Sequence, residues 1–217
     1  MKKRLHDKKA GIAILISLIV IALAELIFRA VAMGLEAVLT TSNLGEQLVT
    51  IILSAFIIIM TLKGKDRICY ICYGAWLGCF VFDQMFGLPS MITNMVVNIS
   101  NPGILSIVIR VIVMICIIAI GALLVEYMHD GSIHNRAFNI LCIVTVLLLA
   151  VDICRGIYGF AFVTPDVTPN GISATLLKNQ IMLDVFNKAY HIVMVFLFTF
   201  FAYDSAKAQL KKTDLTK

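Results

Sequence analysis

Hydrophobic residues fill six long stretches of the chain, and short polar segments separate one stretch from the next. Each stretch is about 16 to 25 residues long, close to the roughly 20 residues that an α-helix needs to cross the hydrocarbon core of a bilayer. The pattern therefore predicts one transmembrane domain over residues 1–217, an all-α bundle of six helices with approximate spans 11–33, 47–62, 68–86, 104–127, 138–162 and 185–203. The joints leave no room for an extramembrane domain.

Charged residues interrupt five of these spans, and they fall at a similar depth. At a rise of 1.5 Å per residue, they lie in the part of each span that is farthest from the chain termini. A charge that faces lipid costs about 2.5 to 17 kcal/mol, depending on the method, so we expect these side chains to line an interior pocket. The candidate solute-binding residues, which include a histidine at the same depth, are Glu25, Arg29, Asp83, Arg110, Asp152, Arg155, Lys188 and His191.

Sequence spacing suggests partners for some of these charges. Glu25 and Arg29 are four residues apart and Asp152 and Arg155 are three apart, so each pair shares one helical face and can form an ion pair. Asp83 and Arg110 have no such local partner, and we expect them to meet each other or a ligand. The opposite signs suit a zwitterion, with a carboxylate at Arg110 or Arg155 and an amine at Asp83 or Glu25. Alternatively, all these charges are buried ion pairs that fix helix packing.

Lysine and arginine are distributed unevenly over the joints, and this predicts the orientation. The termini and the joints on their side of the membrane hold 13 of the 18 basic residues, whereas the opposite joints hold only Lys178. Because cytoplasmic segments carry the excess of basic residues, we place both termini in the cytoplasm and the protein in the cell membrane. The net charge of +5 then follows from topology and contact with anionic membrane lipids, and it does not indicate nucleic-acid binding.

Composition agrees with a membrane protein and narrows the chemistry. Hydrophobic residues make up 60% of the chain, charged residues 14%, and the mean hydropathy is +0.96, which is outside the range of soluble domains. The chain has no metalloprotease, nucleophile-elbow or phosphate-loop motif. We therefore predict that the protein is not an enzyme and uses no cofactor or metal.

The cysteines favour a structural interpretation. Cys69 and Cys72 form a C-x-x-C pair, but the charge distribution places it at the cytoplasmic end of the third span, in a reducing compartment. A metal site would need further cysteine or histidine ligands close by. We therefore interpret the cysteines as free, mostly buried side chains, and thiol chemistry as the less favoured alternative.

Two joints on the far side are long enough to hold additional structure. Residues 87–103 contain an amphipathic stretch at 91–99, and residues 164–183 contain a possible short helix at 173–183. We expect these segments either to cover a bound solute or to rest on the membrane surface.

These features favour capture or movement of a small polar or zwitterionic solute. In size, helix number and cytoplasmic ends, the chain resembles the substrate-binding membrane subunits of energy-coupling-factor vitamin transporters. That resemblance implies a partner transmembrane subunit and ATPases, in line with the lack of a nucleotide motif in this chain. The alternative is a regulatory, immunity or assembly protein of the membrane that transports nothing and whose charges are structural.

Overall fold

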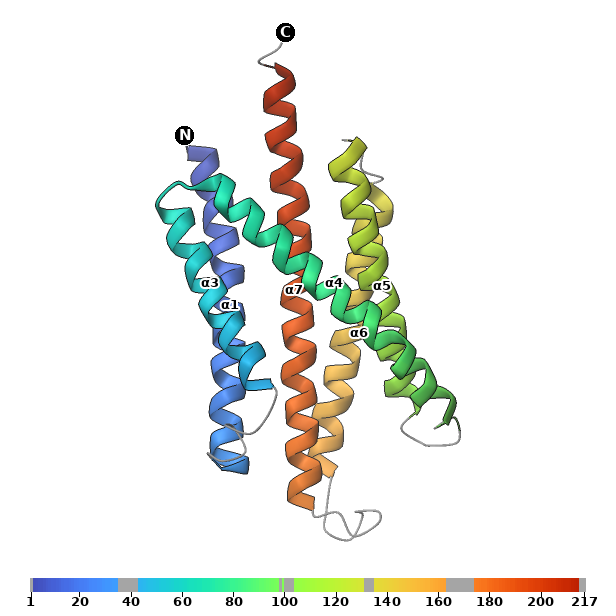
Figure 1. Cartoon of the computed structure of the whole chain (residues 1–217). Helices are drawn as coiled ribbons and strands as arrows, with labels where there is room; N and C mark the ends of the chain where they lie inside the picture. The colour runs from blue at the N-terminus through green and yellow to red at the C-terminus, as the bar shows by residue number, and fades with distance from the viewer. Residues whose placement is uncertain are drawn as a thin grey trace.

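The computed structural model describes residues 2–34, 43–97, 99, 104–130, 135–162 and 174–214 (Figure 1). These residues form helices and contain no strand, which confirms the all-α prediction for this part of the chain. The helices are α1 Lys2–Met33, α3 Asn43–Leu62, α4 Asp66–Val97, α5 Ile104–Asp130, α6 Asn135–Phe162 and α7 Ala174–Asp214.

All six helices contain a segment long and apolar enough to cross a membrane. Each segment overlaps one of the six spans expected from hydropathy, because both follow from the same runs of apolar residues. The structure therefore supports a multi-pass membrane protein. Many large apolar side chains on the outside of the bundle are exposed, as a lipid-facing surface requires, and they include Ile27, Val31, Ile52 and Phe86.

All six described helices extend beyond their predicted spans, and two of them include segments that we expected to be separate. Residues 91–97, expected as a separate amphipathic segment, continue α4, which runs through Pro89 without interruption. The short helix expected at 173–183 is the first part of α7, which begins at Ala174. Residues 174–184 contain no glycine or proline, so nothing in the local sequence ends the helix before the predicted span begins. The remaining residues of these joints lie largely outside the described part of the chain.

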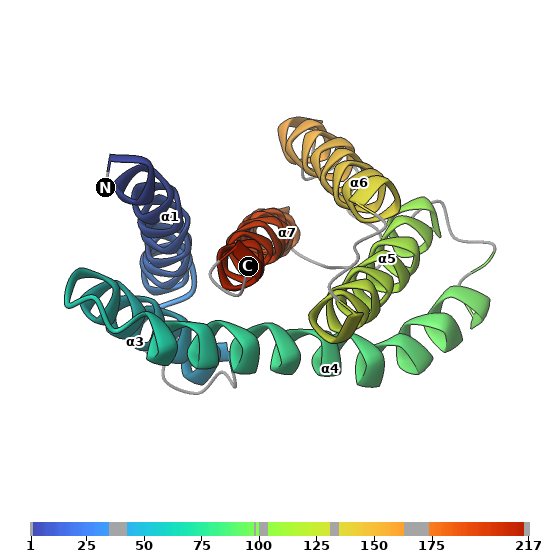
Figure 2. The same cartoon turned by 90° about the horizontal axis from the view of Figure 1, so that it is seen from above.

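The helices are arranged around α7. Viewed from above, α7 lies in the centre, α1 and α3 lie on one side of it, and α5 and α6 lie on the other (Figure 2). Helix α4 runs obliquely across the bundle and packs mainly against α5 and α3 (Figures 1 and 2). Because α1 and α6 both pack extensively on α7, the central helix joins the two pairs. Both termini lie at the same end of the bundle.

The core lies along the inner face of α7. Met194, Leu197, Phe198 and Phe201 are almost fully buried there, together with residues of α1, α4 and α5. Close packing of α4 on α5 depends on glycine: a Cβ atom added at Gly121 would lie 2.7 Å from Cγ2 of Val81. Small residues allow helix backbones to approach in membranes, and here the approach fixes the oblique position of α4.

Candidate functional site

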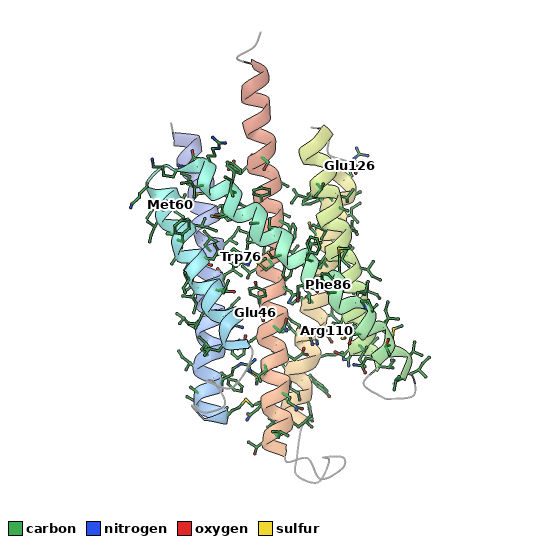
Figure 3. All side chains as sticks on the ribbon, in the orientation of Figure 1. Glu46, Met60, Trp76, Phe86, Arg110 and Glu126 are labelled. Carbon is green, nitrogen blue, oxygen red and sulfur yellow. The ribbon has the colours of Figure 1, made fainter. Side chains whose placement is uncertain are left out.

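A cavity of about 300 Å³ lies between α1, α3, α5 and α7. It occupies the half of the bundle farther from the termini, where Figure 3 shows Glu46 and Arg110. Its wall combines acidic, basic, amide and phenolic side chains. The lining residues are Glu25, Arg29, Glu46, Gln47, Arg110, Gln180, Leu183, Asp184, Asn187 and Tyr190.

On the α1 side of the cavity, Glu25 and Arg29 form the ion pair expected from their spacing. Arg29 donates two hydrogen bonds to Oε1 of Glu25, from Nε at 3.0 Å and from an Nη atom at 2.7 Å. Gln47 of α3 donates from Nε2 to the other carboxylate oxygen at 2.7 Å. All three side chains are buried. The group is therefore satisfied internally, as a buried charge pair must be to persist.

On the opposite side, Lys188 of α7 lies between two carboxylates. Its ammonium is 2.7 Å from Oδ2 of Asp152 on α6 and also contacts Asp184 on α7. The hydroxyl of Ser106 on α5 donates to Asp152 at 3.2 Å. Arg155, the partner expected from spacing, is 4.0 Å from Asp152 and its side chain is 39% exposed. The expected contact exists, but Lys188 is the closer partner.

Two charged residues of the cavity wall have no such partner. Glu46 and Arg110 form no ion pair or hydrogen bond with the residues that the structure describes. Glu46 lies in the first turn of α3, where the helix dipole favours a carboxylate. A direct pair between Asp83 and Arg110, one of the two expected outcomes, is not formed in the described region. Instead, Asp83 accepts a hydrogen bond from Gln84 at 3.2 Å.

His191 lies deeper along α7 than the lining residues. Its Nδ1 is 2.8 Å from the backbone oxygen of Asn187, and its ring lies 5.2 Å from the Phe80 ring, centroid to centroid. It is within electrostatic range of Arg110, Asp83 and Asp184. The histidine is therefore held by its own helix, next to the charged region.

Of the eight residues predicted to bind a solute, the cavity wall includes Glu25, Arg29 and Arg110. Asp152, Arg155 and Lys188 form the ion-pair group beside the wall, whereas Asp83 and His191 are not among the lining residues. Sequence reasoning did not select Glu46, Gln47, Gln180, Asp184, Asn187 or Tyr190 as site residues.

Glu46 and Gln47 were missed for an identifiable reason. The hydropathy pattern placed the start of the second span at residue 47, whereas α3 begins at Asn43. Asn43 and Glu46 have the spacing of a helix-start signal, in which an acidic or amide residue follows a capping residue by three positions. That signal would have extended the helix by one turn and placed Glu46 on it.

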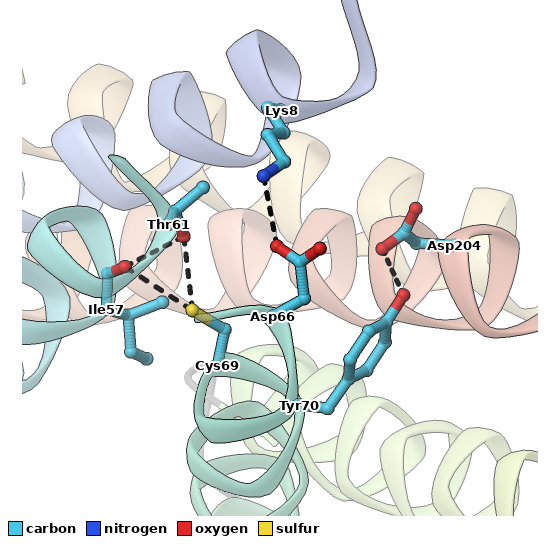
Figure 4. A network of polar contacts seen from close by, with 7 residues as sticks. All are labelled: Lys8, Ile57, Thr61, Asp66, Cys69, Tyr70 and Asp204. Carbon is cyan, nitrogen blue, oxygen red and sulfur yellow. Dashed lines mark hydrogen bonds and ion pairs between the residues drawn. The ribbon is translucent and has the colours of Figure 1, made fainter. Parts of the chain in front are cut away.

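A second polar network lies at the end of the bundle that carries the termini (Figure 4). The ammonium of Lys8 on α1 is 3.0 Å from Oδ1 of Asp66 on α4, and the hydroxyl of Tyr70 on α4 donates to Asp204 on α7. These contacts join α1, α4 and α7 at that end. Close by, the sulfur of Cys69 lies 3.4 Å from the hydroxyl of Thr61.

The thiols and the acidic residues give no sign of metal or redox chemistry in the described part of the chain. All six cysteines are free, and Cys69, Cys116 and Cys142 are buried. No group of histidine, cysteine and carboxylate side chains there has the arrangement of a metal site.

Comparison with protein-family models, with curated proteins and with solved structures found no match to the chain.

Proposed function

We propose that the protein spans the cell membrane and binds a small polar or zwitterionic solute in the cavity between α1, α3, α5 and α7. The observation that carries the proposal is the presence of Glu46 and Arg110 on one cavity wall without partners among the described residues. Unpaired charges are costly within a bilayer, so a ligand that carries both signs would stabilise the site. A cavity of about 300 Å³ limits the ligand to a small molecule.

The proposed roles follow from donor and acceptor chemistry. Arg110 offers a planar guanidinium that can bind a carboxylate through two parallel hydrogen bonds. Glu46 accepts hydrogen bonds from an ammonium group. Glu25, Arg29 and Gln47 form a preorganised wall, because their polar groups already bind one another. The groups provide binding and orientation, so we propose a binding or transport protein rather than an enzyme.

The proposed orientation places both termini in the cytoplasm, and the cavity then lies in the outer half of the membrane. The excess of basic residues at the termini and in the joints of that end supports this orientation. A protein of this kind would collect its solute from outside the cell. Release inside would need a partner transmembrane subunit and ATPases, as the resemblance to substrate-binding subunits of energy-coupling-factor transporters implies.

A second candidate function has its own support. The groups around Glu25 and Asp152 are satisfied by their own neighbours, as expected for ion pairs that only fix helix packing. A regulatory, immunity or assembly protein of the membrane would need nothing more. This alternative assigns no ligand to Glu46 and Arg110.

Native mass spectrometry of the full chain, purified in mild detergent from its own membranes, tests the proposal. We expect a retained small molecule or co-purified ATPases in the wild type, and loss of the small molecule in Arg110→Gln. Glu126→Gln is the matched control, because Glu126 is exposed and lies at the opposite end of the bundle (Figure 3). A chain that carries no small molecule, alone or with an unrelated membrane protein, would instead support the structural alternative.

A further inference from the structure

The charges on the cavity wall do not balance. The wall contains three carboxylates, Glu25, Glu46 and Asp184, and two guanidinium groups, Arg29 and Arg110. In a region of low dielectric constant, an excess charge without a counter-ion is unfavourable. The cavity therefore has one negative charge more than its own wall neutralises.

The contacts show where that excess lies. Among the described residues, Arg29 donates its hydrogen bonds to Glu25, so its charge is already paired with that carboxylate. Asp184 contacts Lys188, but Lys188 also lies 2.7 Å from Asp152. Asp152 has a second cation, Arg155, but only at 4.0 Å and from an exposed position. Lys188 is thus the close cation for both carboxylates, and Asp184 has only a share of it.

The surroundings of Glu46 increase the imbalance. Glu46 lies within electrostatic range of Asp83 and Glu25. Among the described residues, the basic side chain that interacts with it is Arg29, which is already bonded to Glu25. Among the described residues of α7, the remaining cation in the half of the bundle that contains the cavity is Lys178. Its ammonium lies over the Phe160 ring, 5.4 Å from the ring centroid, and Lys178 is not part of the cavity wall.

We infer that the solute carries a net positive charge, with one acidic group at Arg110 and basic groups at Glu46 and Asp184. This inference rests on the proposed function and narrows it to one substrate class, a small diamino acid or a molecule of the same charge pattern. A neutral zwitterion would satisfy Arg110 and only one of the two carboxylates. A ligand with a second amine satisfies both.

Asp184 can accept a ligand amine without disrupting the protein. If the ammonium of Lys188 moves away from Asp184, it keeps Asp152 as its partner, so no buried cation is left unpaired. Glu25 differs, because Arg29 has no second carboxylate among its contacts with the described residues. The two accessible acidic positions of the wall are therefore Glu46 and Asp184.

Three matched probes test this charge pattern. Lysine has one carboxylate and two amines, norleucine lacks the side-chain amine, and 1,5-diaminopentane lacks the carboxylate. The full chain in detergent is titrated with each, and binding is followed by the thermal unfolding midpoint and by the fluorescence of Trp76. Trp76 is the single tryptophan, is buried, and lies near the cavity residue Tyr190.

We expect lysine to bind at least tenfold more tightly than norleucine. Glu46→Gln should reduce this ratio several-fold, and because Glu46 forms no ion pair in the described region, the variant should fold normally. Asp184→Asn should act in the same direction. Arg110→Gln should weaken lysine and norleucine but not 1,5-diaminopentane. Glu126→Gln should leave all three affinities unchanged.

The possible outcomes separate the inference from the proposed function. Equal or tighter binding of norleucine overturns the charge pattern and leaves solute binding intact. If norleucine binds more tightly as the pH falls, a proton on a wall carboxylate supplies the missing positive charge. This outcome also overturns the charge pattern. If no probe binds, the net charge of the molecule found by native mass spectrometry decides. A cation supports the inference, and a neutral or anionic molecule contradicts it. A chain without any bound molecule contradicts both the inference and the proposed function.

Discussion

At the scale of single residues, burial separates the ion pairs that depend on each other from those that solvent can replace. Glu25 and Arg29 are 4% and 7% exposed, and each depends on the other for its counter-charge. Arg155 contacts Asp152 at 4.0 Å from an exposed position, so water or lipid headgroups can replace this contact. Ion pairs with similar spacing in the sequence therefore contribute different amounts to the free energy of unfolding.

This difference predicts the effect of removing each arginine. Arg29→Gln leaves the carboxylate of Glu25 buried with only the Gln47 amide, and we expect the free energy of unfolding to fall by about 3 to 5 kcal/mol. Arg155→Gln should change it by less than about 1 kcal/mol, as for exposed ion pairs. Denaturant titration in detergent micelles measures both.

A second substitution checks the cause. Combining Arg29→Gln with Glu25→Gln removes the unpaired charge, so the double variant should recover part of the lost stability. Equal losses for Arg29→Gln and Arg155→Gln, or no recovery in the double variant, would show that burial of the charge is not the reason.

At the scale of helices, glycine sets the position of α4 on α5. Gly121 of α5 faces the branched side chain of Val81 on α4, with the two methyl groups 2.7 and 3.1 Å from the position of an added Cβ atom. Neither helix can move away without losing contact with its other neighbours. Even alanine, which adds a single methyl group at position 121, therefore requires Val81 or one of the two helices to shift.

Gly121→Ala should lower the unfolding free energy by about 1 to 3 kcal/mol, the usual effect of overpacking a core. Gly78→Ala on α4 is the matched control, since nothing lies within 4 Å of its added Cβ atom, and it should be neutral or slightly stabilising. Val81→Ala added to Gly121→Ala should restore stability. Thermal unfolding in micelles measures all three, and a Gly78→Ala loss equal to that of Gly121→Ala would contradict this explanation.

The helices could be predicted from the sequence, whereas their exact lengths and most of their partners could not. Six apolar runs are a property of local composition, so the number and order of helices followed directly from hydropathy. Gly87 and Pro89 are residue types that usually end or interrupt a helix, so the continuation of α4 through them could not be predicted. The partner of Asp152 is Lys188, from another helix, whereas sequence spacing offered only Arg155. The Glu25 and Arg29 pair was predictable because both residues share a helix.

At the scale of the whole molecule, both termini lie at one end of the bundle and the cavity lies in the other half. If the basic end is cytoplasmic, protease sites fused to either terminus should be protected in intact cells and cut only after the membrane is opened. Cleavage of both sites in intact cells would reverse the proposed orientation. Cleavage at only one terminus would contradict an even number of membrane crossings.

The central position of α7 also has a consequence for biosynthesis. It is the last of the six helices along the chain, yet α1 and α6 both pack on it, and it supplies Lys188 to Asp152. Because α6 precedes α7 in the chain, Asp152 enters the membrane before Lys188 does. Helices α1 to α6 therefore insert before the central helix is present. The cavity wall is complete only when α7 inserts between the pair α1 and α3 and the pair α5 and α6.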